Sequence, residues 1–199
     1  MKRILIAVIV VLASGLWSLS STAIAQPTLV IKPLAEKKVA ELPAEPLFWR
    51  IENFPALAQA QAAAGSWSLV AESAGKVWLF TLGPAGRSSA GGTKVAEVGP
   101  IPGVVAPQYL LRINEASGPQ GSVTPVHTHP GSEAFLVLAG EQSIRSPHGT
   151  MRVKAGQAEA GHGADMPMQV SSSGSTDLHA LVMFVVDATK SFSSPATFP

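Results

Sequence analysis

The stretch GSVTPVHTHPGSEAFLVLAG, residues 121–140, indicates the fold of this chain most directly. His127 and His129 stand two positions apart in it, and Glu133 follows a Pro-Gly-Ser turn signal. Side chains two positions apart on a strand point to the same face, so the imidazoles are predicted to be neighbours. If the turn signal forms a hairpin, His129 lies opposite Glu133 and His127 opposite Phe135. This stretch therefore predicts two imidazoles and a carboxylate on one face of a sheet.

These three side chains suit a metal ion. Two neutral imidazoles and one carboxylate favour a divalent transition ion such as Fe, Mn, Cu, Ni or Zn, and they leave coordination positions free for water or a substrate. The face continues as Phe135, Val137 and Ala139, which form an apolar floor. We expect the metal ligands to include His127, His129 and Glu133, with Glu133 also able to act as a base toward a bound substrate.

The spacing of the stretch is that of a known motif. Glycine, five residues, His-x-His, three residues, Glu, six residues and glycine are matched at every fixed position, namely Gly121, His127, His129, Glu133 and Gly140. This resembles the first motif of the cupin superfamily. The resemblance covers roughly residues 106–188 and implies a small antiparallel β-barrel in which the motif side chains ligate a metal. It also implies pairing into a homodimer.

The fourth ligand expected from the resemblance is less clear. The second cupin motif, counted from Gly156, puts Pro167 at its histidine, or Met168 if one extra residue is allowed. Met168 is a thioether ligand or a core side chain. His162, between two glycines, is a ligand or a solvated loop residue, and His179 faces the cavity or packs in the core. Water remains a further alternative at this position.

The rest of the chain indicates an all-β protein. Gly and Pro, 18 and 16 residues, separate short apolar runs. Six or seven of these runs in residues 106–188 predict an antiparallel cupin or jelly-roll barrel. One short helix is predicted within residues 53–65, with Asn53 as its cap, Pro55 in its first turn and a stop at Gly65.

The chain divides into four predicted segments. Residues 1–25 resemble a signal peptide, with a basic start, an apolar centre and small residues at the end. Residues 26–105 are an N-terminal extension with an extended lead-in, residues 106–188 are the barrel, and residues 189–199 are a tail expected to pack loosely on the surface. We therefore expect a periplasmic or secreted protein with no stable membrane anchor after cleavage.

Composition limits the partners. The chain has no Cys, so neither a disulfide nor a lipid anchor on Cys is available. Without residues 1–25 it carries 12 basic and 13 acidic residues, which gives no basic surface for nucleic acid. A small molecule is the expected ligand. Two functions stay open: a metal-dependent enzyme of the oxygenase type, or a non-catalytic module that binds a metal, a sugar or another small ligand.

Overall fold

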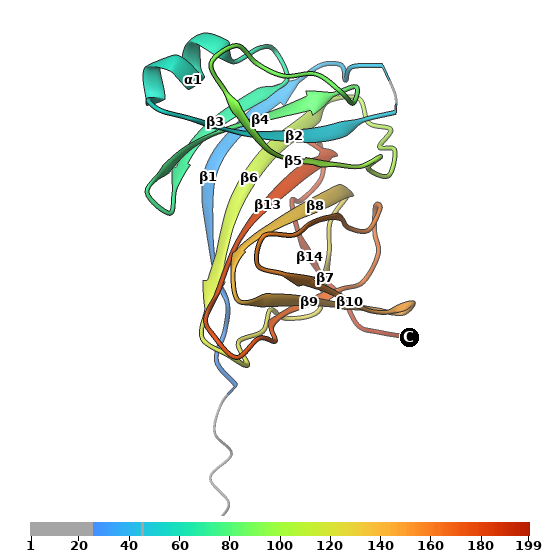
Figure 1. Cartoon of the computed structure of the whole chain (residues 1–199). Coiled ribbons are helices and arrows are strands. Elements are labelled where there is room, and N and C mark those ends of the chain that lie inside the picture. The colour runs from blue at the N-terminus through green and yellow to red at the C-terminus, as the bar shows by residue number, and fades with distance from the viewer. Residues whose placement is uncertain (1–25, 45) are drawn as a thin grey trace, which may run out of the picture.

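The computed structural model describes residues 26–44 and 46–199 (Figure 1). The predicted signal peptide, residues 1–25, lies outside these residues. All named strand pairs are antiparallel. The predicted all-β barrel class is confirmed, and the predicted division of the chain at residue 105 stays a prediction.

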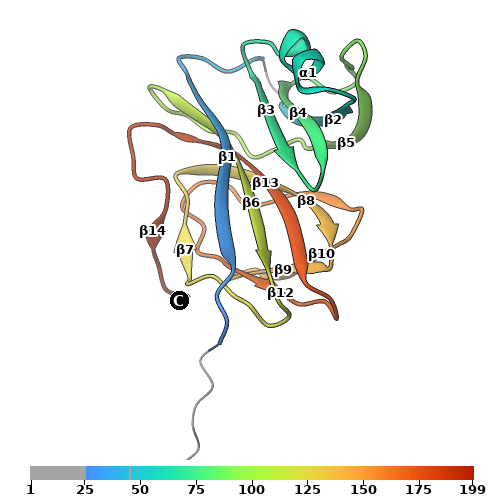
Figure 2. The same cartoon turned by 90° about the vertical axis from the view of Figure 1, so that its left-hand side faces the viewer.

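The barrel is made of one large and two small sheets (Figure 2). The large sheet has the order β1 (Val30–Val39), β6 (Tyr109–Gly118), β13 (Leu178–Asp187), β8 (Gly131–Ala139) and β11 (Ala158–Ala160). The small sheets are β10 (Gly149–Lys154), β9 (Glu141–Ser146) and β12 (Gln169–Ser172), and β14 (Ser194–Pro195) with β7 (His127–Thr128).

A fourth sheet covers the outer face of the large one. It has the order β3 (Ser68–Ser73), β4 (Lys76–Gly83), β2 (Phe48–Phe54) and β5 (Thr93–Val98). Trp49 and Trp78 of this sheet are fully buried in the core between the two sheets. These tryptophans are therefore core residues.

Strand β13 is apolar from Ala180 to Val186 because this part is buried on both faces. Leu181, Met183 and Val185 pack into the core against the fourth sheet. The alternating residues, among them Val182 and Phe184, pack into the interior of the barrel. A strand buried on both sides reads as a continuous apolar run, whereas one with a solvated face alternates. The large sheet thus separates two hydrophobic cores.

The lead-in of the predicted extension joins the barrel itself. Strand β1 pairs along its length with β6, and its register shifts between Pro33 and Ala35. Because β1 is the edge of the sheet, the missing N–H of Pro33 does not interrupt a central ladder. The proline-containing segment is therefore compatible with a long strand at this position.

The helix forms, but its predicted cap was wrong. α1 spans Leu57–Ala63 and is the one α-helix in the described part of the chain. Its N-cap is Ala56, whereas Asn53 lies in β2 and its side-chain amide donates to the carbonyl of Val77. Pairing of β2 with β4 takes Asn53 away from the helix start. Within residues 26–44 and 46–199, no helix is both long and apolar enough to cross a bilayer.

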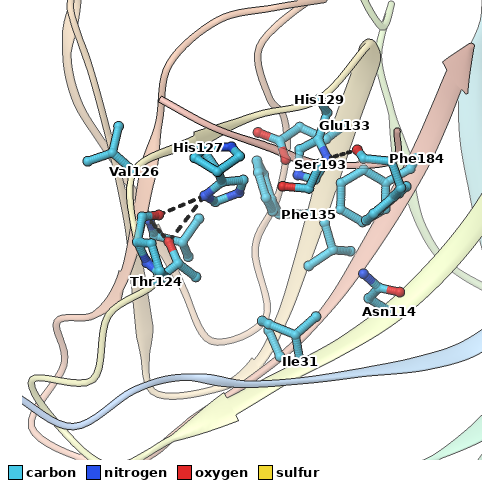
Figure 3. Close-up of a pocket in the computed structure, with 16 residues that line it drawn as sticks. Ile31, Asn114, Thr124, Val126, His127, His129, Glu133, Phe135, Phe184 and Ser193 are labelled. Atoms are coloured by element: carbon cyan, nitrogen blue, oxygen red, sulfur yellow. Dashed lines mark hydrogen bonds between the residues drawn. The ribbon is translucent and has the colours of Figure 1, made fainter. Parts of the chain in front are cut away.

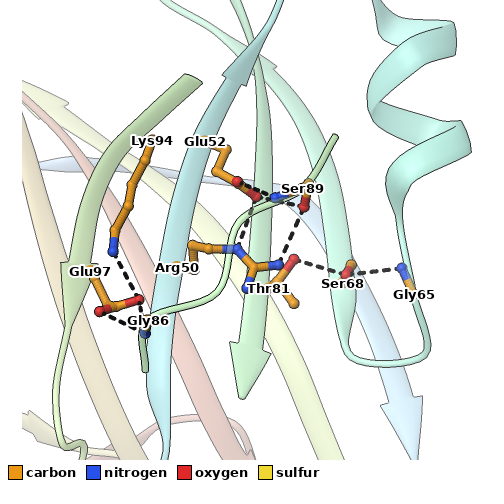
Figure 4. Close-up of polar contacts among 9 residues, drawn as sticks. All are labelled: Arg50, Glu52, Gly65, Ser68, Thr81, Gly86, Ser89, Lys94 and Glu97. Carbon is orange, nitrogen blue, oxygen red and sulfur yellow. Dashed lines mark hydrogen bonds and ion pairs between the residues drawn. The ribbon is translucent and has the colours of Figure 1, made fainter. Parts of the chain in front are cut away.

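The loop between β4 and β5 is fastened to the fourth sheet by a buried carboxylate (Figure 4). Glu52 accepts hydrogen bonds from the backbone N–H and the hydroxyl of Ser89, both at 2.7 Å, and from Nε of Arg50 at 3.0 Å. Burial alone would raise the pKa of Glu52, but these hydrogen bonds outweigh it and lower the pKa. The loop is therefore held by an ionised, fully paired side chain.

The C-terminal tail is mostly exposed, as predicted for a surface segment, but it is paired rather than loosely packed. Ser194 and Pro195 pair with Thr128 and His127 as strand β14, and the N–H of Ala196 donates to the carbonyl of Val126. The tail thus adds a strand beside the motif histidines. Its Ser- and Pro-rich composition gave no indication of this pairing.

Candidate functional site

The interior of the barrel contains a cavity of about 340 Å³ next to the motif (Figure 3). Ten of its lining residues are apolar, from Ile31 on β1 to Pro195 on β14. The polar lining residues are Asn114, Thr124, His127, His129, Glu133 and Ser193. The three ligands predicted from the motif therefore line one cavity.

The predicted hairpin was wrong, although it placed the right side chains together. Gly131 pairs with Val186 of β13, and Glu133 has Phe184 as its partner. His127 instead exchanges two backbone hydrogen bonds with Met168, at 2.9 and 2.8 Å. A Cβ on Gly131 would lie 2.1 Å from the carbonyl oxygen of Val185, so this glycine permits the close approach of β8 to β13. Non-local pairing thus replaces the local turn.

Both motif histidines are oriented by backbone carbonyls. Nδ1 of His127 lies 2.8 Å from the carbonyl oxygen of Pro125, and Nδ1 of His129 lies 2.6 Å from that of Phe192. A carbonyl only accepts, so each Nδ1 carries the hydrogen. In a neutral ring the lone pair is then on Nε2, which forms no hydrogen bond with any described residue. The rings lie 5.0 Å apart at an interplanar angle of 82°.

His129 is the more buried of the two rings. It packs against Phe184 and Phe192, each with its ring centroid 4.8 Å away. Burial lowers the pKa of His129 to about 4, against the opposing effect of the hydrogen bond to the carbonyl of Phe192. His129 is therefore neutral at pH 7, which is the form that binds metal ions.

Glu133 is a buried carboxyl group with an unused oxygen. Its side chain is 3 % exposed, and Oε1 has no hydrogen-bond partner among the described residues. Burial raises the pKa of Glu133 to about 8, against a hydrogen bond from the backbone of His162. A buried polar atom without a partner is costly, so it marks a place for a ligand or a proton.

The candidates for a fourth ligand do not line the cavity. Met168 is buried in the core of the barrel, and its backbone rather than its side chain is paired with His127. His162 touches the site through its backbone, and its buried Nε2 has no partner among the described residues. The ligand role of both stays a prediction.

His179 lies on the other face of the large sheet. Its Nε2 is 3.2 Å from the hydroxyl of Ser73 and 3.1 Å from the carboxylate of Glu115. Ser73 also donates to Glu115. His179 therefore does not line the cavity. It is a half-buried histidine with two polar partners where β3 meets the barrel, not a core residue.

The side chains are close, yet they do not form a ready-made ligand cluster. In the part of the chain that the structure describes, no group of three or more His, Cys, Asp or Glu side chains is placed to hold a metal ion. His127, His129 and Glu133 share a cavity wall, but their present arrangement does not surround a common point.

Two site residues could not be found from the motif. Asn114 of β6 lines the cavity, and its Oδ1 accepts a hydrogen bond from Nε of Arg112. Phe192 comes from the tail and provides both a wall and the carbonyl that orients His129. An aromatic residue in an otherwise Ser- and Pro-rich tail was the available signal for Phe192.

Neither the family models nor the curated proteins compared with the chain give a match. Among solved structures, a cupin-like protein from Thermotoga maritima is 12 % identical, with a TM-score of 0.39 over 44 % of this chain and 65 % of that one. The chain is similar to cupins. An RmlC-like cupin with a double-stranded β-helix fold from Methanocaldococcus jannaschii is 18 % identical, with a TM-score of 0.35 over 38 % of this chain and 70 % of that one.

The matches also include the DMSP lyase DddQ from Ruegeria pomeroyi. It is 23 % identical, with a TM-score of 0.37, and the match covers 43 % of each chain. The matched part thus spans less than half of that lyase. Each of these three matches covers less than half of this chain.

Proposed function

We propose that the barrel binds a divalent transition metal and a small organic molecule in its cavity, and that it catalyses a metal-dependent reaction of the oxygenase type. One observation carries the proposal: at one cavity wall, His127 and His129 each donate Nδ1–H to a backbone carbonyl, and neither Nε2 is hydrogen-bonded to a described residue. Metal-binding histidines are held in this way, because the second hydrogen bond fixes the tautomer and the ring orientation.

The donor set fits a metal ion of the Fe, Mn, Cu, Ni or Zn group. Two neutral imidazoles suit these ions, and Glu133 has a buried oxygen with no hydrogen-bond partner among the described residues. Coordination by all three requires the Glu133 carboxylate to turn toward the rings and to lose its proton. The charge of the ion would supply the compensation that this buried carboxylate lacks.

The metal, the apolar walls and Glu133 would each contribute differently to the reaction. A bound metal would polarise a substrate oxygen or activate dioxygen. The apolar walls exclude water and hold the substrate. Glu133 faces the cavity, so it can accept a proton from a bound molecule and return it.

Metal analysis tests the proposal. Untagged wild-type protein is compared with the His127→Ala/His129→Ala double variant, and His148→Ala serves as a control because His148 is exposed at the β9–β10 turn. We expect about one ion per chain in the wild type and the control, and less than a tenth of that in the double variant. Equal, substoichiometric metal in all three would overturn metal binding.

Activity separates the two functions left open by the sequence. Oxygen uptake or product formation is followed across aromatic and keto-acid compounds after reconstitution with Fe, Mn or Cu. Turnover that depends on the metal supports the enzyme. Metal and ligand binding without turnover supports the non-catalytic module instead.

Export is a separate part of the proposal. The basic start, apolar centre and small residues of residues 1–25 support a periplasmic or secreted protein. Expression of the full chain in a bacterium followed by N-terminal sequencing tests it. We expect the periplasmic or extracellular form to begin at Gln26, whereas an intact Met1 in the cytoplasmic fraction would contradict export.

A further inference from the structure

We infer that the cavity selects a neutral, ring-containing molecule, and that Phe192 enforces this choice by covering the guanidinium of Arg112. The inference rests on the proposed function, because it takes the cavity to be the ligand site. It adds the class of the ligand and the residue that determines specificity.

The size and the aromatic lining of the cavity favour one or two rings. A volume of about 340 Å³ holds about a dozen non-hydrogen atoms, taking the share of one water molecule as about 30 Å³. Phe135, Phe184 and Phe192 present aromatic surfaces to this space. Aromatic side chains stack on flat rings through their faces and edges. A branched, fully hydroxylated molecule such as a sugar would leave most of its polar groups unpaired against these walls.

The polar groups of the cavity suit a ligand that carries a hydroxyl or carbonyl group. Asn114 uses Oδ1 to accept from Arg112, which leaves its Nδ2 to donate to a ligand. His127 and His129 offer Nε2 as an acceptor or as a metal ligand. No Lys or Arg is among the lining residues that the structure describes. In the metal-free cavity, a carboxylate or phosphate would therefore enter without a cationic partner among the lining residues.

The cation that could pair with an anionic ligand is covered. The guanidinium of Arg112 lies over the ring of Phe192, 4.3 Å from its centroid. It also donates to Asn114 and lies 3.7 Å from the carboxylate of Glu36. The Phe192 ring also packs against the ring of Phe184, with 4.9 Å between the two centroids, and against the imidazole of His129. Phe192 thus contacts both this cation and the aromatic wall of the cavity.

Removing the ring should change the preferred charge of the ligand. In Phe192→Ala, Arg112 loses its cover and can reach a carboxylate in the cavity. The backbone carbonyl of residue 192 remains, so the contact that orients His129 is kept. Phe192→Leu keeps an apolar cover and is the matched control. Phe192→Ala/Arg112→Gln removes the cation from the widened cavity.

Calorimetric titration with 2-naphthylmethanol, 2-naphthoate and glucose tests the inference. The first two have nearly the same size and differ in charge, while glucose is of similar size and polar. Metal is first removed with a chelator, so that the carboxylate cannot bind through an ion. Metal content before removal is recorded for the same preparation.

We expect the wild type to bind 2-naphthylmethanol and to bind 2-naphthoate at least about tenfold more weakly. Phe192→Ala should shift the ratio toward 2-naphthoate by about tenfold, and the double variant should cancel that shift. Phe192→Leu should leave the ratio unchanged.

A wild type that prefers 2-naphthoate or glucose, or that binds none of the three, overturns the inference. So does a Phe192→Ala gain that survives the loss of Arg112. Normal metal content with no binding of 2-naphthylmethanol contradicts the ligand class alone. Binding of 2-naphthylmethanol by a chain that never held metal contradicts the proposed metal alone.

Discussion

The imidazole of His129 donates its Nδ1–H to the backbone carbonyl of Phe192, with 2.6 Å between the two heavy atoms. The two residues are 63 positions apart in the sequence, and strand β14 brings them together. The C-terminal segment therefore takes part in the site, because it fixes which nitrogen of His129 faces a ligand.

Removal of the C-terminal segment, residues 191–199, should weaken metal binding. A chain that ends at Lys190 lacks both Phe192 and β14, and loss of such an orienting partner weakens metal affinity about 10- to 100-fold. Zinc affinity is measured by competition with a chromogenic chelator, and far-UV circular dichroism checks folding. Deletion of residues 197–199 alone, which leaves Phe192 and β14 in place, should have no effect. Full affinity in the chain ending at Lys190 would show that the carbonyl does not matter.

Glu133 should make the stability of the metal-free protein depend on pH. The pKa of Glu133 is raised from 4.5 to about 8 by burial, so between these values the folded chain keeps a proton that the unfolded chain has released. The free energy of unfolding should therefore fall as pH rises from about 4.5 to 8, by up to about 5 kcal/mol.

Urea unfolding across this pH range measures the effect. Glu133→Gln should remove most of the slope, because the variant has no proton to release there. Glu159→Gln alters an exposed carboxylate on β11 and should keep the wild-type slope. Equal slopes in the wild type and Glu133→Gln would contradict the protonated state of Glu133.

Substitution of the two glycines that delimit the motif should lower the free energy of unfolding by different amounts. Gly140 has φ 73°, and a Cβ there would lie 2.6 Å from the carbonyl oxygen of Asp177. Gly121 has φ 82°, and a Cβ there meets nothing within 4 Å. We expect Gly121→Ala to cost about 1 kcal/mol of unfolding free energy, and Gly140→Ala about 2–4 kcal/mol. Thermal or urea unfolding gives both values, and equal costs would mean that the contact with Asp177 relaxes freely.

Much of the site could be predicted because the motif is local. Residues 121–140 contain both histidines and Glu133, and the structure has all three at one cavity. The short helix and the strand-rich barrel were also predictable, since periodicity and turn residues act over short distances.

The remaining features depend on pairing between distant segments. His127 pairs with Met168 and Pro195, which lie 41 and 68 positions further along the sequence. No local pattern therefore showed that these distant pairings would replace the predicted hairpin. The tail carried no alternation that marks a strand, and β14 is only two residues long. The apolar run of β13 predicted burial but could not say that one of its faces belongs to a second sheet.

A crystal structure of the metal-loaded protein tests the central claim most directly, by an anomalous difference map at the absorption edge of the bound metal. The account predicts one peak in the cavity, about 2.0–2.2 Å from Nε2 of both His127 and His129, with a Glu133 oxygen turned toward it. A peak at Nδ1 of either ring, a peak only outside the cavity, or no peak in protein with one metal per chain would contradict it.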